Sequence, residues 1–174
     1  MQGFESFKNL LGRMESNNNY LAINSSSGAL GKYQFLPSTL TSLQFNSNLP
    51  PWLSDYNFLN SPGLQEIYFK AHINDLTNFI NNNDLNRFTG SLVRGSKRFL
   101  GIRAPLNIYG MLAGAHLAGP GTLRNYLNTG SNPDDGYTSL TDYMAYFSKN
   151  TADVGYLIPV LGLAFLSLVL VYYD

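Results

Sequence analysis

The chain has no cysteine, few charged residues and only two histidines. Without cysteine it has no disulfides and no cysteine-ligated metal sites. The histidines, His72 and His116, lie far apart in the sequence and show no metal-ligand spacing, and neither a GxSxG elbow nor a glycine-rich phosphate loop occurs. These absences exclude most thiol, metal and nucleotide chemistry, and we expect no cofactor and no metal.

Charged residues make up 13% of the 174 residues, about half the usual share, and eleven basic and eleven acidic residues cancel. A neutral chain has no overall field that favours nucleic acid, so we expect no nucleic-acid partner. The surface must then consist largely of Asn, Ser, Thr and Tyr. Such a surface suits hydroxyl-rich partners such as glycans, although an Asn-rich composition also arises from base bias alone.

The two ends of the chain differ in hydrophobicity. The N-terminus lacks the basic region and apolar run of a signal peptide. Residues 154–173 carry no charge, would span about 30 Å as a helix, and have tyrosines at both ends. We interpret this run as a transmembrane tail anchor, with a buried core helix as the alternative. The predicted domains are a folded domain over residues 1–150 and a C-terminal anchor over residues 151–174.

Apolar residues recur at helical spacing through most of the first 150 residues. The pattern predicts helices over residues 4–14, 61–83, 106–118 and 122–127, and short helices after Pro37 and over residues 139–149. The helix over residues 61–83 should bury one apolar face, made of Leu64, Ile67, Tyr68, Ile73, Leu76 and Ile80. Prolines make residues 43–62 irregular. We therefore predict one mainly α domain, with a small β-turn region after Glu15, plus one C-terminal transmembrane helix.

Glu15, one of only three glutamates, lies where the first predicted helix meets a polar, turn-forming loop. It is either a solvated helix-end residue or a catalytic acid. A loop folded back over the carboxyl would partly remove it from water and favour a general acid at neutral pH. Glycosidic cleavage needs such an acid. The next acid, Asp55, has no motif around it, which fits a mechanism in which the sugar itself supplies the nucleophile.

Three blocks carry a family resemblance: "ESNNNYLAINSSSGALGKYQFLPSTL" from Glu15, "GMLAGAHLAGPGTLRNYL" from Gly110 and "DDGYTSLTDYMAYF" from Asp134. In this order they resemble the motifs of lysozyme-like lytic transglycosylases, and most closely the Ala-His-Leu variant of phage and conjugation-associated members. Each block alone is weak, but the ordered set covers residues 12–147. The resemblance implies a goose-type lysozyme fold. It also implies cleavage of the MurNAc-GlcNAc β-1,4 bond of peptidoglycan, which leaves 1,6-anhydromuramoyl ends.

The resemblance also implies roles for single residues. Glu15 is the general acid that protonates the glycosidic oxygen and then, as base, activates the muramic C6 hydroxyl. Among the substrate-binding residues, Gln34 hydrogen-bonds the glycan, Ser16 holds the turn beside the acid, and Gly119 lets the backbone approach the cleft. The hydroxyl of Tyr143 faces this carboxyl. An equally favoured alternative is that Tyr143 is a core residue of its helix.

Two features depart from the family pattern or lie outside it. His116 and Leu117 replace the usual Tyr-Asn pair, so His116 either lines the saccharide cleft or is a satisfied core histidine, which we slightly favour. A local basic cluster faces stem-peptide carboxylates, phospholipid headgroups or a capsid protein, unless it is simply a solvated loop. Its members are Arg94, Lys97, Arg98 and Arg103.

The leading interpretation is a tail-anchored lytic transglycosylase, with a lysozyme-type hydrolase as the fallback. We expect a single-pass membrane protein in the membrane of a lipid-containing bacteriophage virion, where it serves cell-wall penetration. The expected partners are peptidoglycan strands, the lipid membrane through residues 154–173, and capsid or vertex proteins. The alternatives are a structural linker between membrane and capsid, or a glycan-binding module, against which the retained Glu15 argues.

Overall fold

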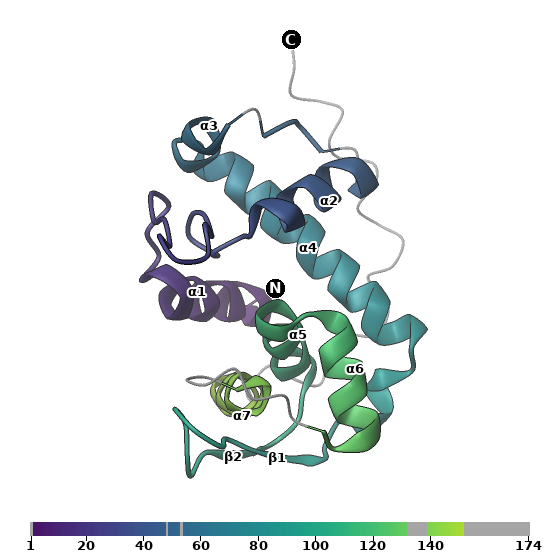
Figure 1. Ribbon diagram of the computed structural model, residues 1–174. Coiled ribbons are helices and arrows are strands. Elements are labelled where there is room, and N and C mark those ends of the chain that lie inside the picture. The colour runs from purple at the N-terminus through teal and green to yellow at the C-terminus, as the bar shows by residue number, and fades with distance from the viewer. Residues whose placement is uncertain (1, 48, 53, 132–138, 152–174) are drawn as a thin grey trace.

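The computed structural model describes residues 2–47, 49–52, 54–131 and 139–151, and this part of the chain is mainly helical. Its elements are α1 (Gln2–Ser16), α2 (Pro37–Ser47), α3 (Asp55–Leu59), α4 (Pro62–Asn82), the 3-10 helix η1 (Leu85–Phe88), β1 (Leu92–Arg94), β2 (Arg103–Pro105), α5 (Ile108–Ala118), α6 (Pro120–Thr129) and α7 (Leu140–Asn150). Helix α4 runs diagonally across the view of Figure 1, with α2 and α3 above it and α1, α5, α6, α7 and the hairpin of β1 and β2 below it.

Six of the helices lie where the sequence predicts them, and four elements were not predicted. Helix α3 interrupts the segment expected to be irregular, because Ser54 caps its N-terminus by accepting a hydrogen bond from the backbone N–H of Asn57. The others are η1 and the antiparallel hairpin of β1 and β2, in which Leu92 pairs with Pro105 and Arg94 with Arg103. The loop after Glu15 forms only isolated β-bridges.

The core forms around aromatic side chains of α1. The ring of Phe7 is fully buried, with its centroid 5.1 Å from that of Tyr109 on α5 and 5.7 Å from that of Phe147 on α7. It also lies 6.4 Å from Phe69 on α4, which stacks on Tyr33 at 3.9 Å. One ring of α1 thus joins four segments that are distant in sequence.

Helix α5 is the central helix, since all its residues from Tyr109 to Ala115 are buried. It packs closely on α7 because two of its residues have no side chain. A Cβ on Gly110 would clash with Ser148 Oγ, and one on Gly114 would lie 2.7 Å from Leu140 Cδ1. This close packing fixes the position of α7 along α5, and in that position α7 reaches the C-terminal end of α1.

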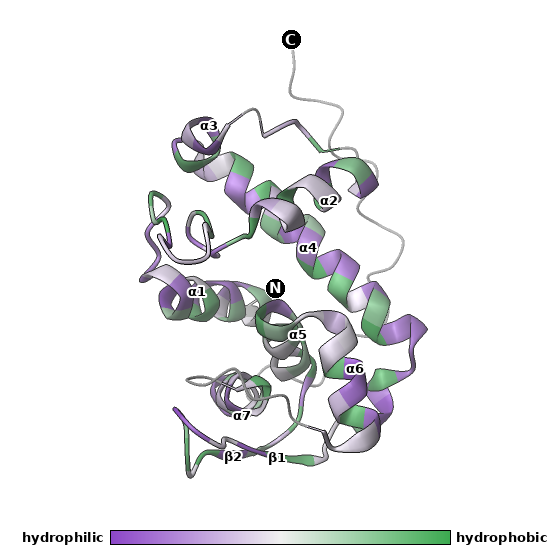
Figure 2. Ribbon diagram, viewed as in Figure 1, coloured by the Kyte–Doolittle hydropathy of each residue, from purple (hydrophilic) through white to green (hydrophobic). Residues whose placement is uncertain are grey.

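Helix α4 buries most of the predicted face. Tyr68, Ile73, Leu76 and Ile80 are buried and Leu64 is half-buried, but Ile67 is 45% exposed, so its placement in the core was wrong. Its place is taken by Gln65 and Phe69, which lie on the side of the helix that faces the loop after Glu15. Hydrophobic and hydrophilic residues alternate along α4 (Figure 2), as expected of a helix with one buried face.

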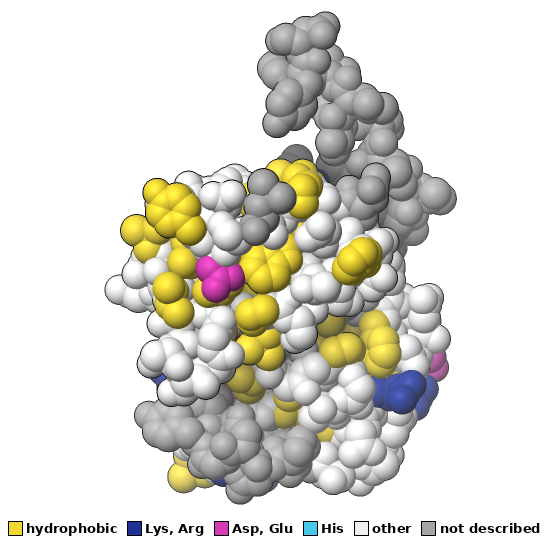
Figure 3. All heavy atoms as spheres, turned by 45° about the horizontal axis from the view of Figure 1, so that its top comes forward, with side chains coloured by type: hydrophobic (Ala, Val, Ile, Leu, Met, Phe, Trp, Pro, Cys, Tyr) yellow, Lys and Arg dark blue, Asp and Glu magenta, His cyan; other side chains and the backbone are white. Residues whose placement is uncertain are grey.

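The surface carries few charges, in line with the composition. On the face turned forward in Figure 3, hydrophobic and uncharged polar side chains predominate. The most exposed large hydrophobic residues include Phe45 on α2, at 81%, and Tyr56 on α3, at 74%.

The predicted membrane anchor has to be corrected. Within the described ranges, no helix is both long enough and apolar enough to cross a membrane. The longest, α4, has 21 residues but carries Glu66, Lys70 and Asp75. The run of residues 154–173, on which the anchor was predicted, lies outside the described residues. We therefore correct the fold class to mainly helical and withdraw the single-pass localisation in a virion membrane.

The packing of Phe7 leads to a first prediction. Replacing it in Phe7→Ala should lower the free energy of unfolding by about 3–5 kcal/mol, because the cavity left among four segments cannot collapse. Urea unfolding followed by circular dichroism measures this. The matched control is Phe45→Ala, at an exposed position of α2, which should change the free energy of unfolding by less than about 0.5 kcal/mol. Equal effects of the two changes would show that the core is not organised around Phe7.

Candidate active site

Glu15 lies in the last turn of α1, half-buried, and faces α7. The hydroxyl of Tyr143 donates a hydrogen bond to its Oε1 at 2.9 Å, across 128 residues of sequence. The ring of Tyr143 is 4% exposed and packs 5.6 Å from Phe147. Both interpretations of Tyr143 therefore hold at once, because its ring belongs to the core and its hydroxyl reaches the carboxyl.

The position of Glu15 is electrostatically unfavourable for the helix. The C-terminal end of a helix carries a partial negative charge, which disfavours an acid in the last turn by a few tenths to about 1 kcal/mol. Within the described residues Glu15 forms no ion pair that offsets this cost. A carboxyl kept at such a place does not serve to stabilise the helix.

Ser16 shapes the loop beside Glu15. Its hydroxyl donates to the backbone carbonyl of Lys32 at 2.8 Å and accepts from the backbone N–H of Asn19 at 3.0 Å. The chain turns there through Asn17 and Asn18, both at positive φ, a conformation that Asn tolerates better than most residues. The single hydroxyl proton of Ser16 is thus used within the chain, to bring the returning loop against α1.

Gln34 and His116 meet at a small cavity of about 50 Å³, on the side of the loop that faces α4 and α5. The Nε2 of Gln34 donates to the carbonyl of Gly31 at 2.9 Å, which fixes its side chain along the loop. The Nε2 of His116 lies 3.0 Å from the carbonyl oxygen of Tyr33 and therefore donates to it. Its Nδ1 lies 3.2 Å from Nε2 of His72.

The two histidines share a hydrogen bond. Burial, and then the neighbouring His116, lower the pKa of His72 to about 3, so His72 is neutral. Of the two nitrogens that meet, Nε2 of His72 and Nδ1 of His116, one donates and the other accepts. His116 thus both lines a cavity and is satisfied within the core. Among the described residues, no three His, Asp or Glu side chains gather in a way that could hold a metal.

Gly119 separates α5 from α6 at φ 86°. A Cβ added there would meet no atom within 4 Å, and the same holds for Gly121. Glycine is therefore required at position 119 by the positive φ of the sharp turn, and the described residues show no close approach that excludes a side chain.

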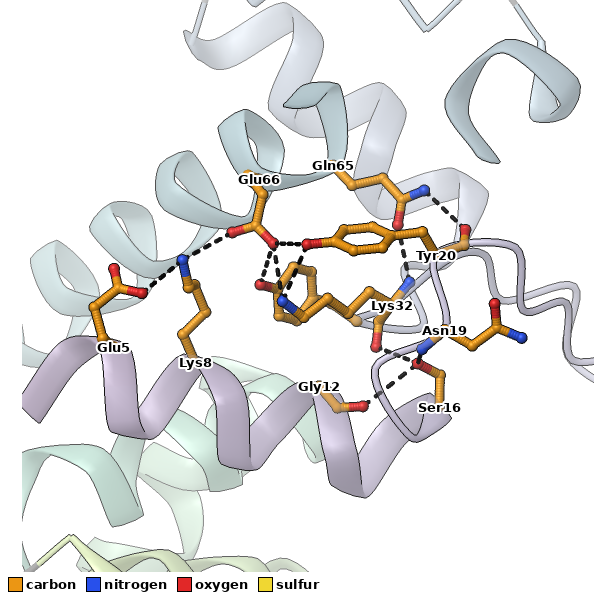
Figure 4. Close-up of polar contacts among 10 residues, drawn as sticks. Glu5, Lys8, Gly12, Ser16, Asn19, Tyr20, Lys32, Gln65 and Glu66 are labelled. Carbon is orange, nitrogen blue, oxygen red and sulfur yellow. Dashed lines mark hydrogen bonds and ion pairs between the residues drawn. The ribbon is translucent and has the colours of Figure 1, made fainter. Parts of the chain in front are cut away.

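Glu66 is the centre of a polar network that the sequence pattern does not predict (Figure 4). Its Oε1 accepts from the hydroxyls of Tyr20 and Tyr33, both at 2.7 Å, and from Nζ of Lys32 at 3.0 Å. Its Oε2 pairs with Lys8 of α1 at 3.2 Å. Burial alone would raise the pKa of Glu66, but these hydrogen bonds outweigh it and lower the pKa to about 2. Glu66 is therefore a permanent anion whose Oε1 is held by three donors and whose Oε2 is held by Lys8.

Gln65 fastens the same loop from the adjacent position of α4 (Figure 4). Its Oε1 accepts from the backbone N–H of Lys32 at 2.9 Å, and its Nε2 donates to the carbonyls of Tyr20 at 2.9 Å and Phe58 at 3.0 Å. A side chain on Gly31 would clash with it. One signal for this role was available, because Gln65 is a polar residue on the buried face of a helix, and such a residue needs partners.

Asp142 is the second anion that organises the chain. Its fully buried carboxylate accepts backbone N–H groups of the turn between β1 and β2 and of Ser139. The donors in the turn are Ser96, Lys97, Arg98 and Phe99, at 2.9–3.2 Å. Burial would raise the pKa of Asp142, but these bonds lower it. The basic cluster is thus held on a turn that is fixed to the N-terminus of α7.

The pKa of Glu66 leads to a prediction about acid stability. Because its pKa is lower in the folded state than the usual 4.5, it stabilises the fold above about pH 4.5, and this contribution is lost as pH falls towards 2. The wild-type chain should therefore lose free energy of unfolding between pH 5 and 2. Glu66→Gln should start less stable at pH 7 and lose less over that interval, as measured by urea unfolding.

The matched control is Asp84→Asn, because the Asp84 side chain is 78% exposed in its pair with Arg87. Exposed pairs contribute little, so this variant should follow the wild-type pH profile. If Glu66→Gln loses as much stability as the wild type between pH 5 and 2, then Glu66 is not the anion that holds the loop.

Comparison with known proteins assigns the chain to no family. No protein-family model matches it, and no curated protein matches it. The function considered next is therefore argued from the residues of this chain and from their geometry.

Proposed function

We propose that this protein is a peptidoglycan lytic transglycosylase in which Glu15 is the single catalytic acid and base. The observation that carries the proposal is the hydrogen bond from the buried Tyr143 to the half-buried Glu15. It is supported by the order of the three sequence blocks, which bring Glu15, Gln34 and Tyr143 into one domain. The proposed bond is the MurNAc-GlcNAc β-1,4 linkage.

The hydrogen bond from Tyr143 gives the two carboxyl oxygens of Glu15 different roles. Its hydroxyl holds Oε1, and no described residue bonds Oε2 of Glu15. Oε2 is therefore the oxygen available to carry a proton towards a ligand. The ring of Tyr143 on α7 is buried and packs on Phe147, so the donor is fixed before any substrate arrives. A fixed donor of this kind keeps the carboxyl in one orientation through both steps of the reaction.

The proposed reaction needs no second carboxyl and no added water. Glu15 gives its proton to the glycosidic oxygen as the bond between that oxygen and muramic C1 breaks. The C6 hydroxyl of the same muramic residue then attacks C1, and its proton returns to Glu15. The products are one new saccharide hydroxyl and one 1,6-anhydro ring, and the carboxyl is again protonated.

The other acids considered support a single-acid mechanism. Glu66 is surrounded by four donors and stays ionised. Both oxygens of Asp142 accept backbone N–H groups. Asp55 is exposed in the first turn of α3. Hydrolytic glycosidases usually hold a second carboxylate in the site for water or for a covalent intermediate.

The first test is Glu15→Gln on purified peptidoglycan. The amide still accepts the hydrogen bond from Tyr143 but cannot protonate the leaving oxygen. The rate of clearing should fall by about 10²–10⁴-fold. Removing the charge from the C-terminal turn should leave the melting temperature unchanged or slightly raised. Turbidity and thermal unfolding measure the two effects.

Glu5→Gln is the matched control, because Glu5 also lies on α1 but is 57% exposed and pairs only with Lys8. It should clear peptidoglycan at the wild-type rate. The assignment of Glu15 is wrong if Glu15→Gln clears at a similar rate to this control.

The second test concerns the ends of the products. If the C6 hydroxyl is the nucleophile, the released muropeptides carry 1,6-anhydro ends and weigh one water less than the reducing forms. Mass spectrometry of a complete digest separates the two. A digest made of reducing ends alone would show hydrolysis and would require a water-activating group that the proposal does not include.

A further inference from the structure

The basic cluster of the hairpin has no part in the proposed reaction. The hairpin of β1 and β2 forms the lower edge of the molecule in Figure 1, below α7. Its inner residues, Val93 and Ala104, are buried, and both strands pack against α7. Arg94 and Arg103 point the other way, because successive side chains of a strand alternate between its faces, and both are exposed. The outer face of the hairpin therefore has no partner within the described part of the chain.

Arg94 and Arg103 lie directly opposite each other in the register of the two strands. The backbone N–H of Gly95 donates to the carbonyl of Ile102 at 3.0 Å, which marks the next pair along the ladder as hydrogen-bonded. Hydrogen-bonded and non-hydrogen-bonded pairs alternate in an antiparallel ladder, so Arg94 and Arg103 form a pair of the second kind. The side chains of such a pair start about 4.5–5.5 Å apart. The two guanidinium groups can therefore meet one anion.

Among the described residues, no acid forms an ion pair with Arg94 or Arg103. Like charges directly opposite each other destabilise a pair of strands, so this arrangement does not serve the hairpin itself. Arg98 adds a third exposed charge in the turn, where its backbone N–H donates to Asp142 at 3.1 Å. Asp142 is fully buried beneath the turn and presents no charge at the surface. A face with three exposed cations suits an anionic partner.

Apolar side chains on the same hairpin indicate the kind of anionic partner. Leu92, on the same face of β1 as Arg94, is 58% exposed, and Leu100, in the turn, is 78% exposed. Four backbone N–H groups of the turn donate to Asp142, so Leu100 is exposed on a turn of fixed shape. A soluble polyanion would cover the arginines but leave both leucines in water. A bilayer with anionic headgroups offers phosphates to the arginines and acyl chains to the leucines.

We propose that the outer face and the turn of this hairpin bind the headgroup layer of an anionic lipid bilayer. The contact is peripheral and needs no membrane-spanning helix. The arginines lie at the level of the lipid phosphates, and Leu100 enters the boundary between headgroups and acyl chains. Each cation near an anionic surface strengthens binding about fivefold, so three arginines strengthen it about 10²-fold at low salt. This inference goes beyond the proposed function and does not depend on it.

The first test is sedimentation of the full chain with two kinds of vesicle, phosphatidylcholine alone and equal parts phosphatidylcholine and phosphatidylglycerol. The anionic vesicles should bind about 10²-fold more tightly at low salt, and this preference should shrink in about 0.5 M salt. Arg94→Gln together with Arg103→Gln should lower the affinity for anionic vesicles about 20-fold. The matched control is Arg87→Gln together with Arg124→Gln, which removes the same charge from η1 and α6. It should lower this affinity by no more than about twofold.

The second test shows which part of the chain meets the bilayer. The chain has one tryptophan, so in a Trp52→Phe background Leu100→Trp reports on the turn alone. Its emission should shift to shorter wavelength with the anionic vesicles, because the indole leaves water. The matched control in the same background is Tyr56→Trp on α3, which is 74% exposed and lies at the other end of the molecule in Figure 1. The emission of this control should not change.

Equal affinity for both kinds of vesicle overturns the inference, and this comparison needs no substitution. An unchanged emission of Leu100→Trp also overturns it, since another part of the chain would then make the contact. An equal loss in the two double variants does the same, because binding would follow net charge alone. Inorganic polyphosphate should bind more weakly than the anionic vesicles, and equally tight binding would assign the arginines to a soluble polyanion instead. None of these measurements involves peptidoglycan, so the proposed function is judged separately.

Discussion

The arrangement around Glu15 depends on the half-buried anion of Glu66. This carboxylate joins α4 to Lys8 of α1 and to Tyr20, Tyr33 and Lys32 of the loop. Lys32 is only 5% exposed, and a buried ammonium without its partner would cost several kcal/mol. The loop can therefore lie against α1 only when Glu66 is ionised and in place. The turn held by Ser16 beside Glu15 then follows from the position of the loop.

Three carboxyls on this chain have different surroundings, and the difference indicates their roles. Four donors meet the carboxylate of Glu66 and five backbone N–H groups donate to that of Asp142, and in both cases hydrogen bonds lower the pKa below its usual value. Such anions shape a fold but cannot exchange protons near neutral pH. Glu15 receives one hydrogen bond, from a residue 128 positions away, and lies at the unfavourable end of its helix. An acid that stabilises so little and is held so specifically is the best candidate for chemistry.

The helices could be predicted because apolar periodicity depends on local sequence, and the caps of α4 and α7 are readable as Ser61 and Ser139. The hairpin and α3 could not be predicted, because these elements are too short to show a periodic pattern of apolar residues. The partners of Glu66 and Asp142 were missed since they are long-range pairings that no spacing encodes. Ile67 is exposed although it lies on the predicted apolar face, so periodicity alone does not identify every buried residue. The membrane anchor was inferred from the length of an uncharged run and the tyrosines at its ends, and no helix of the described residues supports it.

The central claim is that Glu15 cleaves the glycan strand by transferring one proton, with the muramic C6 hydroxyl as the nucleophile. Digestion of purified peptidoglycan in ¹⁸O-labelled water tests it most directly, because only a hydrolytic cut takes an oxygen from the solvent. The account predicts products without ¹⁸O from the wild-type chain, and almost no products from Glu15→Gln. One ¹⁸O in each new muramoyl end would contradict it.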